Sequence, residues 1–220
     1  SAADDAAGFA IAERMTAQVR GLNMATKNAN DGLAMLSTIE NATNDVTDML
    51  QRIRELAVQA ANDTNGAQDR TYLQTEVDSL VAEINRVSTD TVYNDSVVLD
   101  GNLSGSLQVG TASGQTIDFA IDSIDATTLG VDALDFTDAT TAATALTAID
   151  SAIETVAGNR AGYGALSNRL EYTVSNLMNV AEFTTAARSR IEDADFAAES
   201  ARLAKAQVLQ QTGTAMLAQA

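Results

Sequence analysis

The chain opens with a long run of apolar residues at helical spacing. Hydrophobic side chains recur every three or four positions between about residues 5 and 61, and the same spacing returns in residues 68–87. This period predicts two amphipathic helices. The turn-forming cluster Asn62–Gly66 leaves only a short connection between them, so we expect the second helix to fold back antiparallel on the first. The stripe that ends the first helix contains Met49, Ile53, Leu56 and Ala60.

The middle of the chain departs from this helical pattern. Apolar and polar residues alternate within residues 97–121 around glycine-containing turns, which predicts a β-hairpin with one apolar face. Residues 122–138 are expected to form an irregular, acidic link. Helical spacing returns over residues 139–190, and a last amphipathic helix is expected within residues 191–220. The expected fold class is therefore mainly α: an elongated antiparallel bundle of long helices, similar to a coiled-coil rod, with one small β-hairpin region.

Composition indicates a helical and thinly packed core. Hydrophobic residues make up 45% of the chain but aromatic residues only 4%, so alanine supplies much of the apolar share, and no proline interrupts a helix. The 13 basic and 30 acidic residues give a net charge of −17, which disfavours binding to nucleic acid or to anionic membranes. No run of about 18 apolar residues and no secretory signal sequence is visible. The first residue is Ser1 rather than methionine, so we expect a processed or trimmed chain.

The residue types needed for most catalytic sites are missing. Without histidine or cysteine, the chain cannot build a Ser-His-Asp triad or a thiolate or imidazole zinc site. The acidic residues within 122–138 and 192–195 lack the spacing of a calcium loop, so solvated turns explain them better. Gly162-Tyr163-Gly164 is a lone glycine pair in a helical pattern, which close packing of a neighbour explains best. Spacing alone leaves paired-carboxylate catalysis open, but we expect no enzyme activity, no cofactor and no metal.

Several segments, in the right order, resemble the terminal regions of bacterial flagellins. They are Ser1–Gly8, Asn28–Gly32, Leu50–Ala60, Ser167–Tyr172, Ala187–Phe196 and Lys205–Gln211. The resemblance implies a conserved rod domain over residues 1–190, in which helices from the two chain ends pair, and part of the C-terminal inner-core helix over residues 191–220. The family's N-terminal inner-core helix would precede Ser1 and is missing here. The implied function is that of a structural subunit that self-assembles into the extracellular flagellar filament for motility.

The resemblance also implies partners and a recognition surface. The expected partners are further copies of the chain, the flagellar type III export apparatus, a secretion chaperone, and the filament cap and hook-junction proteins, with no nucleic acid and no membrane insertion. Toll-like receptor 5 of a vertebrate host is a further expected partner. The resemblance assigns receptor binding and subunit packing to Gln51, Arg52, Leu56, Gln59 and Glu76. Composition alone favours the alternative that these are solvated residues with intramolecular ion pairs.

Three other functions are compatible with the helical pattern. A hook-associated junction protein would share related terminal helices, but its motifs diverge more and its middle region is usually larger. A cell-surface binding module for polysaccharide, built on a flagellin-like scaffold, would ordinarily show clustered aromatic or basic residues, whereas this chain has no tryptophan. A coiled-coil scaffold unrelated to motility would make the hairpin incidental.

Overall fold

The computed structural model describes residues 6–193 and 196–219, and the chain divides into two compact units. One unit comprises residues 24–178, and the other comprises residues 1–23 together with 179–220. Asp5, the expected first residue of the first helix, and Asp195 of the C-terminal motif lie outside the described residues. The helices are α1 (Ala6–Ala60), α2 (Ala67–Asp90), α3 (Ala139–Glu192) and α4 (Phe196–Gln219), and the strands are β1 (Val92–Tyr93), β2 (Ser96–Val97), β3 (Ser104–Gln108) and β4 (Thr116–Ala120).

The expected fold class, mainly α with a small β-hairpin region, is confirmed. The bounds of α1, α2 and α3 lie within three residues of those that the apolar spacing predicts. The expected boundary between residues 190 and 191 divides the chain by family domains rather than by compact units, and it stays a prediction.

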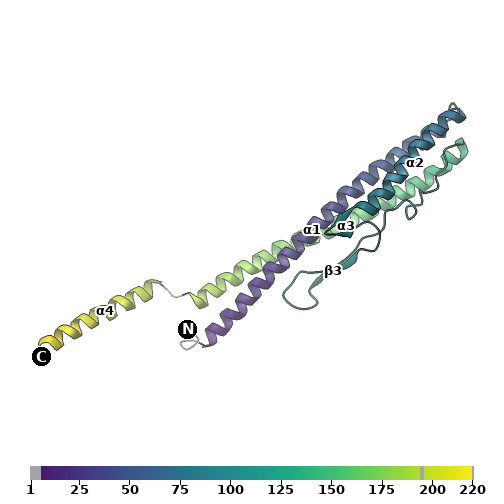
Figure 1. Ribbon diagram of the computed structural model, residues 1–220. Helices are drawn as coiled ribbons and strands as arrows, with labels where there is room; N and C mark the ends of the chain where they lie inside the picture. Colours follow the sequence, from purple (N-terminus) through teal and green to yellow (C-terminus); the bar gives the residue numbers. More distant parts are fainter. Residues whose placement is uncertain (1–5, 194–195, 220) are drawn as a thin grey trace. The chain divides into compact units, whose positions relative to one another are not determined.

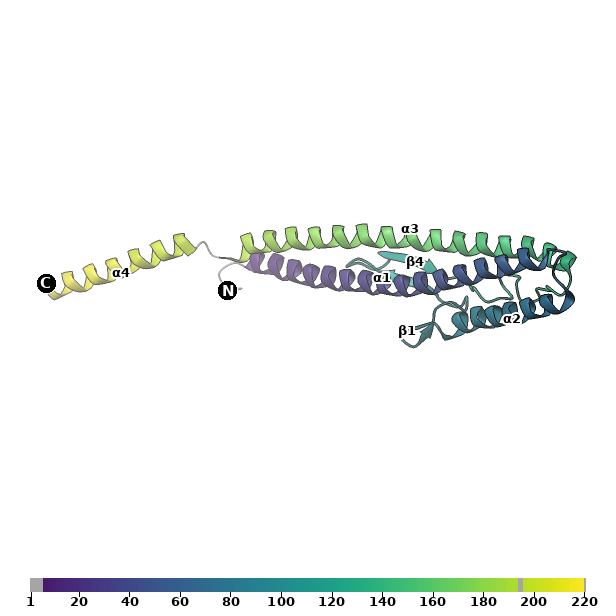
Figure 2. The same cartoon turned by 90° about the horizontal axis from the view of Figure 1, so that it is seen from above.

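In the unit of residues 24–178, α2 and α3 lie antiparallel alongside α1 (Figure 1 and Figure 2). The turn between α1 and α2 is held by Arg70, whose Nε donates to the carbonyl of Ala60 at 2.8 Å and whose Nη2 donates to that of Asn62 at 3.0 Å. These bonds satisfy carbonyl groups that the end of a helix leaves without partners. At the start of α2, the Gly66 N–H donates to Asp69 Oδ2 at 3.0 Å. The short connection therefore closes the helical hairpin through polar contacts at both of its ends.

The core of this unit is a continuous stripe of aliphatic side chains from all three helices. Each large aliphatic side chain that becomes fully buried contributes about 1.5–3 kcal/mol relative to exposure. Alanines occupy positions between the larger residues, which lets the helices approach closely. Fully buried members of the stripe are Leu36, Ile39, Leu50, Ile53, Ile84, Ile149 and Leu170, with alanines at Ala29, Ala57, Ala142 and Ala152.

The β-hairpin packs on α1. Strands β3 and β4 pair antiparallel with Leu107 opposite Ile117, which is buried. A Cβ on Gly32 of α1 would lie 2.5 Å from the Cδ1 of Leu107, so glycine is the residue that lets the hairpin approach this closely. Asn28 of the same helix donates from its Nδ2 to the carbonyl of Gln108 at 3.0 Å. The hairpin thus packs on α1 through both apolar and polar contacts.

Only part of the predicted strand region 97–121 forms that hairpin. Val97 belongs instead to β2, which pairs with β1 across Asn94 and Asp95. Both of these turn residues have positive φ, 48° and 63°, as a two-residue type I′ turn requires. Beyond β2, Val98 is buried in the core and in no strand. The extended region is therefore two short hairpins joined by a connection that begins in the core at Val98 and Leu99.

Residues 122–138 form no helix or strand, as expected, but they are part of the core rather than a solvated link. Two side chains of α2 hold them. Gln74 accepts from the Phe136 N–H at 2.6 Å and donates to the carbonyl of Leu134 at 3.0 Å, while Asn85 accepts from the Ala126 N–H at 2.9 Å. The buried apolar residues of the segment are Ile124, Ala126, Leu129, Val131 and Phe136. The acidic residues of the segment lie between these buried residues, and most of them are exposed. The sequence therefore shows no apolar pattern of a kind that predicts burial.

The other unit contains the beginning of α1, the end of α3, and α4. Ala12 and Leu22 are buried on α1, and Arg188 of α3 donates from its Nη1 to Thr16 Oγ1 at 3.3 Å. On α4, the side chains from 201 to 214 are exposed. None of the helices, over the residues described, combines the length and the apolar character needed to cross a membrane.

Candidate interaction surface

Four of the five residues assigned to the recognition surface lie on one exposed face of the helical hairpin. Gln51, Arg52 and Gln59 are exposed on α1, and Glu76 is exposed on α2. Arg52 and Glu76 connect the two helices through a 2.9 Å ion pair. The structure therefore brings together residues that are 17 or more positions apart in the sequence on a single surface.

Arg52 is held by carboxylates on both helices. Its Nη1 lies 2.9 Å from Glu55 Oε2, and its Nε donates to Glu76 Oε1 at 2.9 Å. The hydrogen bonds that Arg52 donates to Glu55 and to Glu76 raise the pKa of its guanidinium, so the group is charged at every pH of interest. Because all three side chains are exposed, solvent screens their attraction, and the network contributes orientation more than stability. Arg52 thus presents a fixed planar donor group.

Leu56 does not belong to this surface. Its side chain is only 1% exposed, and Ile53, Ala57 and Ala60 around it are also buried. These residues are three or four positions apart and share the face of α1 that packs on the core. Leu56 is also a member of the apolar stripe that predicts the helix, and a residue of that stripe faces the core rather than the solvent. The structure therefore places Leu56 in the core rather than on the exposed face, and its assignment to receptor or subunit contact stays a prediction.

Two exposed apolar residues extend the surface and were not predicted. Tyr72 is 66% exposed and lies one turn before Glu76 on α2, while Val58 lies seven residues after Gln51 on α1. Such spacings place each pair on the same side of its helix. Their exposure could have been predicted from the sequence, because neither residue falls in the apolar stripe of its helix. Among the described residues, no group of three or more acidic side chains could hold a metal ion.

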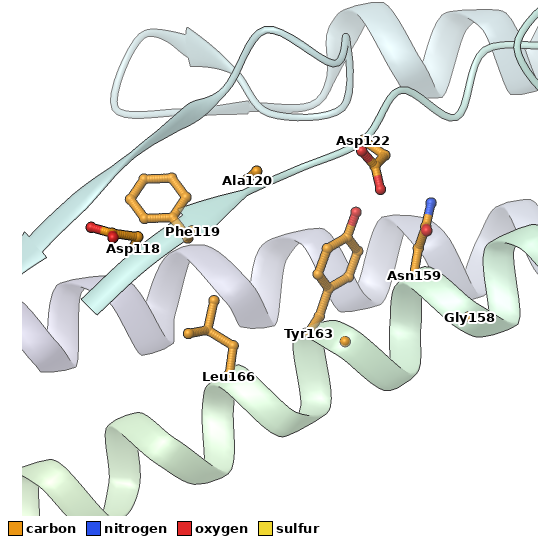
Figure 3. A pocket seen from close by; sticks show the side chains of 9 residues that line it. Asp118, Phe119, Ala120, Asp122, Gly158, Asn159, Tyr163 and Leu166 are labelled. Carbon is orange, nitrogen blue, oxygen red and sulfur yellow. The ribbon is translucent and has the colours of Figure 1, made fainter.

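A second polar feature lies in the same unit, where β4 faces α3 (Figure 3). A groove of about 360 Å³ is bordered by Asp122 and Phe119 on one side and by Asn159 and Tyr163 on the other. Burial raises the pKa of the Tyr163 phenol. The backbone of Asp122 opposes this rise in pKa, and the charge of the Asp122 carboxylate adds to it.

The glycines of this part of α3 do not mark close packing, contrary to the expectation for Gly162-Tyr163-Gly164. A Cβ placed on Gly158, Gly162 or Gly164 would meet no described atom within 4 Å. Gly158 and Gly162 instead border the groove, one turn apart. Their missing side chains leave the space open.

Comparisons with known proteins connect this architecture to one family. The model of the bacterial flagellin N-terminal helical region matches residues 1–104, and that of the C-terminal helical region matches residues 146–220. The flagellin of Halalkalibacterium halodurans is 43% identical over 222 residues, which cover 100% of this chain and 82% of that protein. The chain belongs to the bacterial flagellin family. Flagellins are structural subunits of the flagellar filament and not enzymes, so this chain is a self-assembling filament subunit.

Solved structures place the fold in the same group. The crystal structure of Bacillus cereus flagellin has a TM-score of 0.61 and 29% identity, over 69% of this chain and 88% of that one. A putative flagellar hook-associated protein from Vibrio parahaemolyticus has a TM-score of 0.72 over 86% of this chain and 100% of that one. Its identity of 17% shows a shared fold alone, so it does not favour the hook-associated alternative.

Proposed function

We propose that this flagellin is exported through the flagellar type III apparatus with a secretion chaperone, and that it polymerises outside the cell into the filament that drives motility. The filament cap and the hook-junction proteins are its partners at the two ends of the polymer. One observation carries the polymerisation: large apolar side chains stand uncovered on the helices, which marks surfaces that associate with a partner. The most exposed of these are Tyr172, Phe183, Tyr72, Leu209 and Leu203.

Negative-stain microscopy of the purified protein after addition of salt or of sheared filament seeds tests this proposal. We expect filaments from the unaltered protein. Tyr172→Ser removes an exposed aromatic ring from α3 and should slow seeded growth. Asn176→Ser changes an exposed polar residue one turn further along α3, and its growth should match that of the unaltered protein. A protein that stays monomeric at every seed concentration would rule the proposal out.

We also propose that the exposed face formed by Gln51, Arg52, Gln59 and Glu76 is recognised by Toll-like receptor 5. The fixed guanidinium supports this, because Arg52 is oriented before any partner arrives and loses little side-chain freedom on binding. Leu56 takes no direct part and instead supports the helix from the core side. The same face is available to neighbouring subunits, so receptor binding and subunit packing would compete for it.

A receptor reporter assay with purified monomer tests this second proposal. Arg52→Asp should reduce activation, because it reverses the charge at the centre of the face and repels Glu55 and Glu76. Arg54→Asp is the matched control. Arg54 is equally an exposed arginine of α1 in a cross-helix ion pair, but its partner is Asp150 of α3, on another side of the helix. Equal activation by the Arg52 variant and the unaltered protein would disprove the receptor proposal.

A further inference from the structure

The groove between β4 and α3 contains polar atoms that the fold leaves without partners. The phenol oxygen of Tyr163 and the Nδ2 of Asn159 are both buried, and neither forms a hydrogen bond with any described residue. Tyr163 is only 7% exposed. Figure 3 shows its hydroxyl pointing across the groove toward Asp122, with the Asn159 amide beside it. A buried polar group without a partner costs free energy, so a guest that forms hydrogen bonds with this pair would be favoured.

The shape and charge of the groove define that guest. Gly158 and Gly162 leave open backbone at its floor, where a Cβ would meet nothing within 4 Å. Asp118 and Asp122 place two exposed carboxylates along its rim, in a chain that already carries a net charge of −17. An anionic guest would be repelled from this position. A cationic guest would be attracted.

The available acceptors match a guanidinium group. Asp122 offers a carboxylate and Tyr163 offers a phenol oxygen. The amide of Asn159 presents its oxygen in place of its nitrogen after a 180° rotation of the amide group, an exchange that leaves the shape of the side chain unchanged. Guanidinium is planar and carries five N–H donors and no acceptor, so it can bond to all three at once. An uncharged urea group of the same shape would also donate hydrogen bonds but would lack the attraction between its own positive charge and the carboxylates.

We propose that this groove binds the side chain of an arginine from a second copy of the chain. This proposal rests on the proposed polymerisation, which brings copies into contact. The chain supplies suitable guests: Arg14, Arg20 and Arg169 are exposed, and none forms an ion pair with a described residue. In so acidic a protein, an unpaired arginine of one copy and an acidic groove of another are complementary. The contact would orient neighbouring subunits because only one planar group fits the acceptors.

The binding step can be tested on the monomer, independently of assembly. N-acetyl-arginine amide is titrated into the ¹⁵N-labelled protein while the side-chain amide resonance of Asn159 is followed, and N-acetyl-citrulline amide serves as the uncharged probe of the same shape. We expect a saturable shift with the arginine probe and none with the citrulline probe. Tyr163→Phe and Asp122→Asn should each weaken binding, the second by about tenfold or more because it removes a charged partner. Tyr72→Phe, an exposed tyrosine of α2, should leave binding unchanged.

Equal shifts with both probes, or no shift with either, would overturn the groove as a guanidinium site. The identity of the guest is tested separately by seeded growth of filaments. Asp122→Arg should slow growth, and one of the substitutions Arg14→Asp, Arg20→Asp or Arg169→Asp should restore it. Arginine binding by the monomer together with normal growth of the Asp122→Arg variant would overturn the second copy as the source. If no variant and no unaltered protein polymerises, the proposed polymerisation fails, while the probe titration still decides the chemistry of the groove.

Discussion

Replacing Phe136 with alanine tests whether residues 122–138 belong to the core. Phe136 is fully buried, and its backbone N–H donates to Gln74 of α2. Burial of a phenylalanine side chain contributes about 1.5–3 kcal/mol, and the cavity left by its removal brings the cost of such a substitution to about 3–5 kcal/mol. With a urea dependence of about 2 kcal/mol per molar, a loss of about 4 kcal/mol lowers the midpoint of unfolding by about 2 M.

Urea unfolding followed by circular dichroism, with hydrogen exchange to check that the unit of residues 24–178 unfolds cooperatively, measures this effect. Phe183→Ala provides the matched control, since it deletes the same ring at an exposed position of the other unit and should change stability by about 0.5 kcal/mol or less. If the two variants had the same midpoint, residues 122–138 would be a surface link and the packing described above would be incorrect.

Three further substitutions test other contacts of the same unit. Ser88→Ala removes the 2.9 Å hydrogen bond to the buried carbonyl of Leu99 and should cost about 1–3 kcal/mol in the free energy of unfolding measured with urea. Gly32→Ala should clash with the side chain of Leu107, because the new Cβ would lie 2.5 Å from the Leu107 Cδ1. In a Leu107→Ala background this clash is gone, and the same substitution should stabilise the folded protein by up to about 1 kcal/mol. A double-mutant cycle of the two substitutions should therefore show coupling. A backbone N–H lowers the pKa of Asp125 below its ordinary 3.8, so its carboxylate stabilises the folded state above that pH and the stabilisation is lost as pH falls. Stability of Asp125→Asn should therefore depend less on pH below about 4 than that of the unaltered protein.

The helices could be predicted from the sequence because their apolar spacing is uninterrupted. Residues 122–138 could not, because their buried residues follow neither helical nor strand spacing and are anchored by distant side chains such as Gln74 and Asn85. The β1–β2 turn was missed for a related reason. Asn94-Asp95 lacks the glycine that usually marks a type I′ turn, although both residues tolerate positive φ better than most.

The recognition surface shows a different limit of sequence reasoning. The residues that the family resemblance grouped together divide in the structure, because Gln51, Arg52 and Gln59 lie on an exposed face whereas Leu56 is buried. A match to a family motif does not distinguish the residues of a segment, whereas in a helix some of these side chains point into the core and others point into solvent. Arg52 and Leu56 are four positions apart, but the boundary of the core falls between them, so one is solvated and the other is not. Only the position of α2 and α3 around α1 decides on which side of that boundary a residue lies.

The same geometry explains why one turn of α1 can serve both the fold and a partner. Arg52 and Arg54 are two positions apart, or about 200° around the helix, so they reach α2 and α3 respectively. Ile53 lies between them in sequence and points into the core. Exposed ion pairs add little stability, so the core residue fixes the position of this turn while the two arginines fix its orientation against its neighbours. A partner that binds the Arg52 face would meet a guanidinium already paired with Glu55 and Glu76. Such a partner must add donors for these carboxylates or an acceptor for the remaining N–H groups, and a purely apolar partner would leave them unsatisfied.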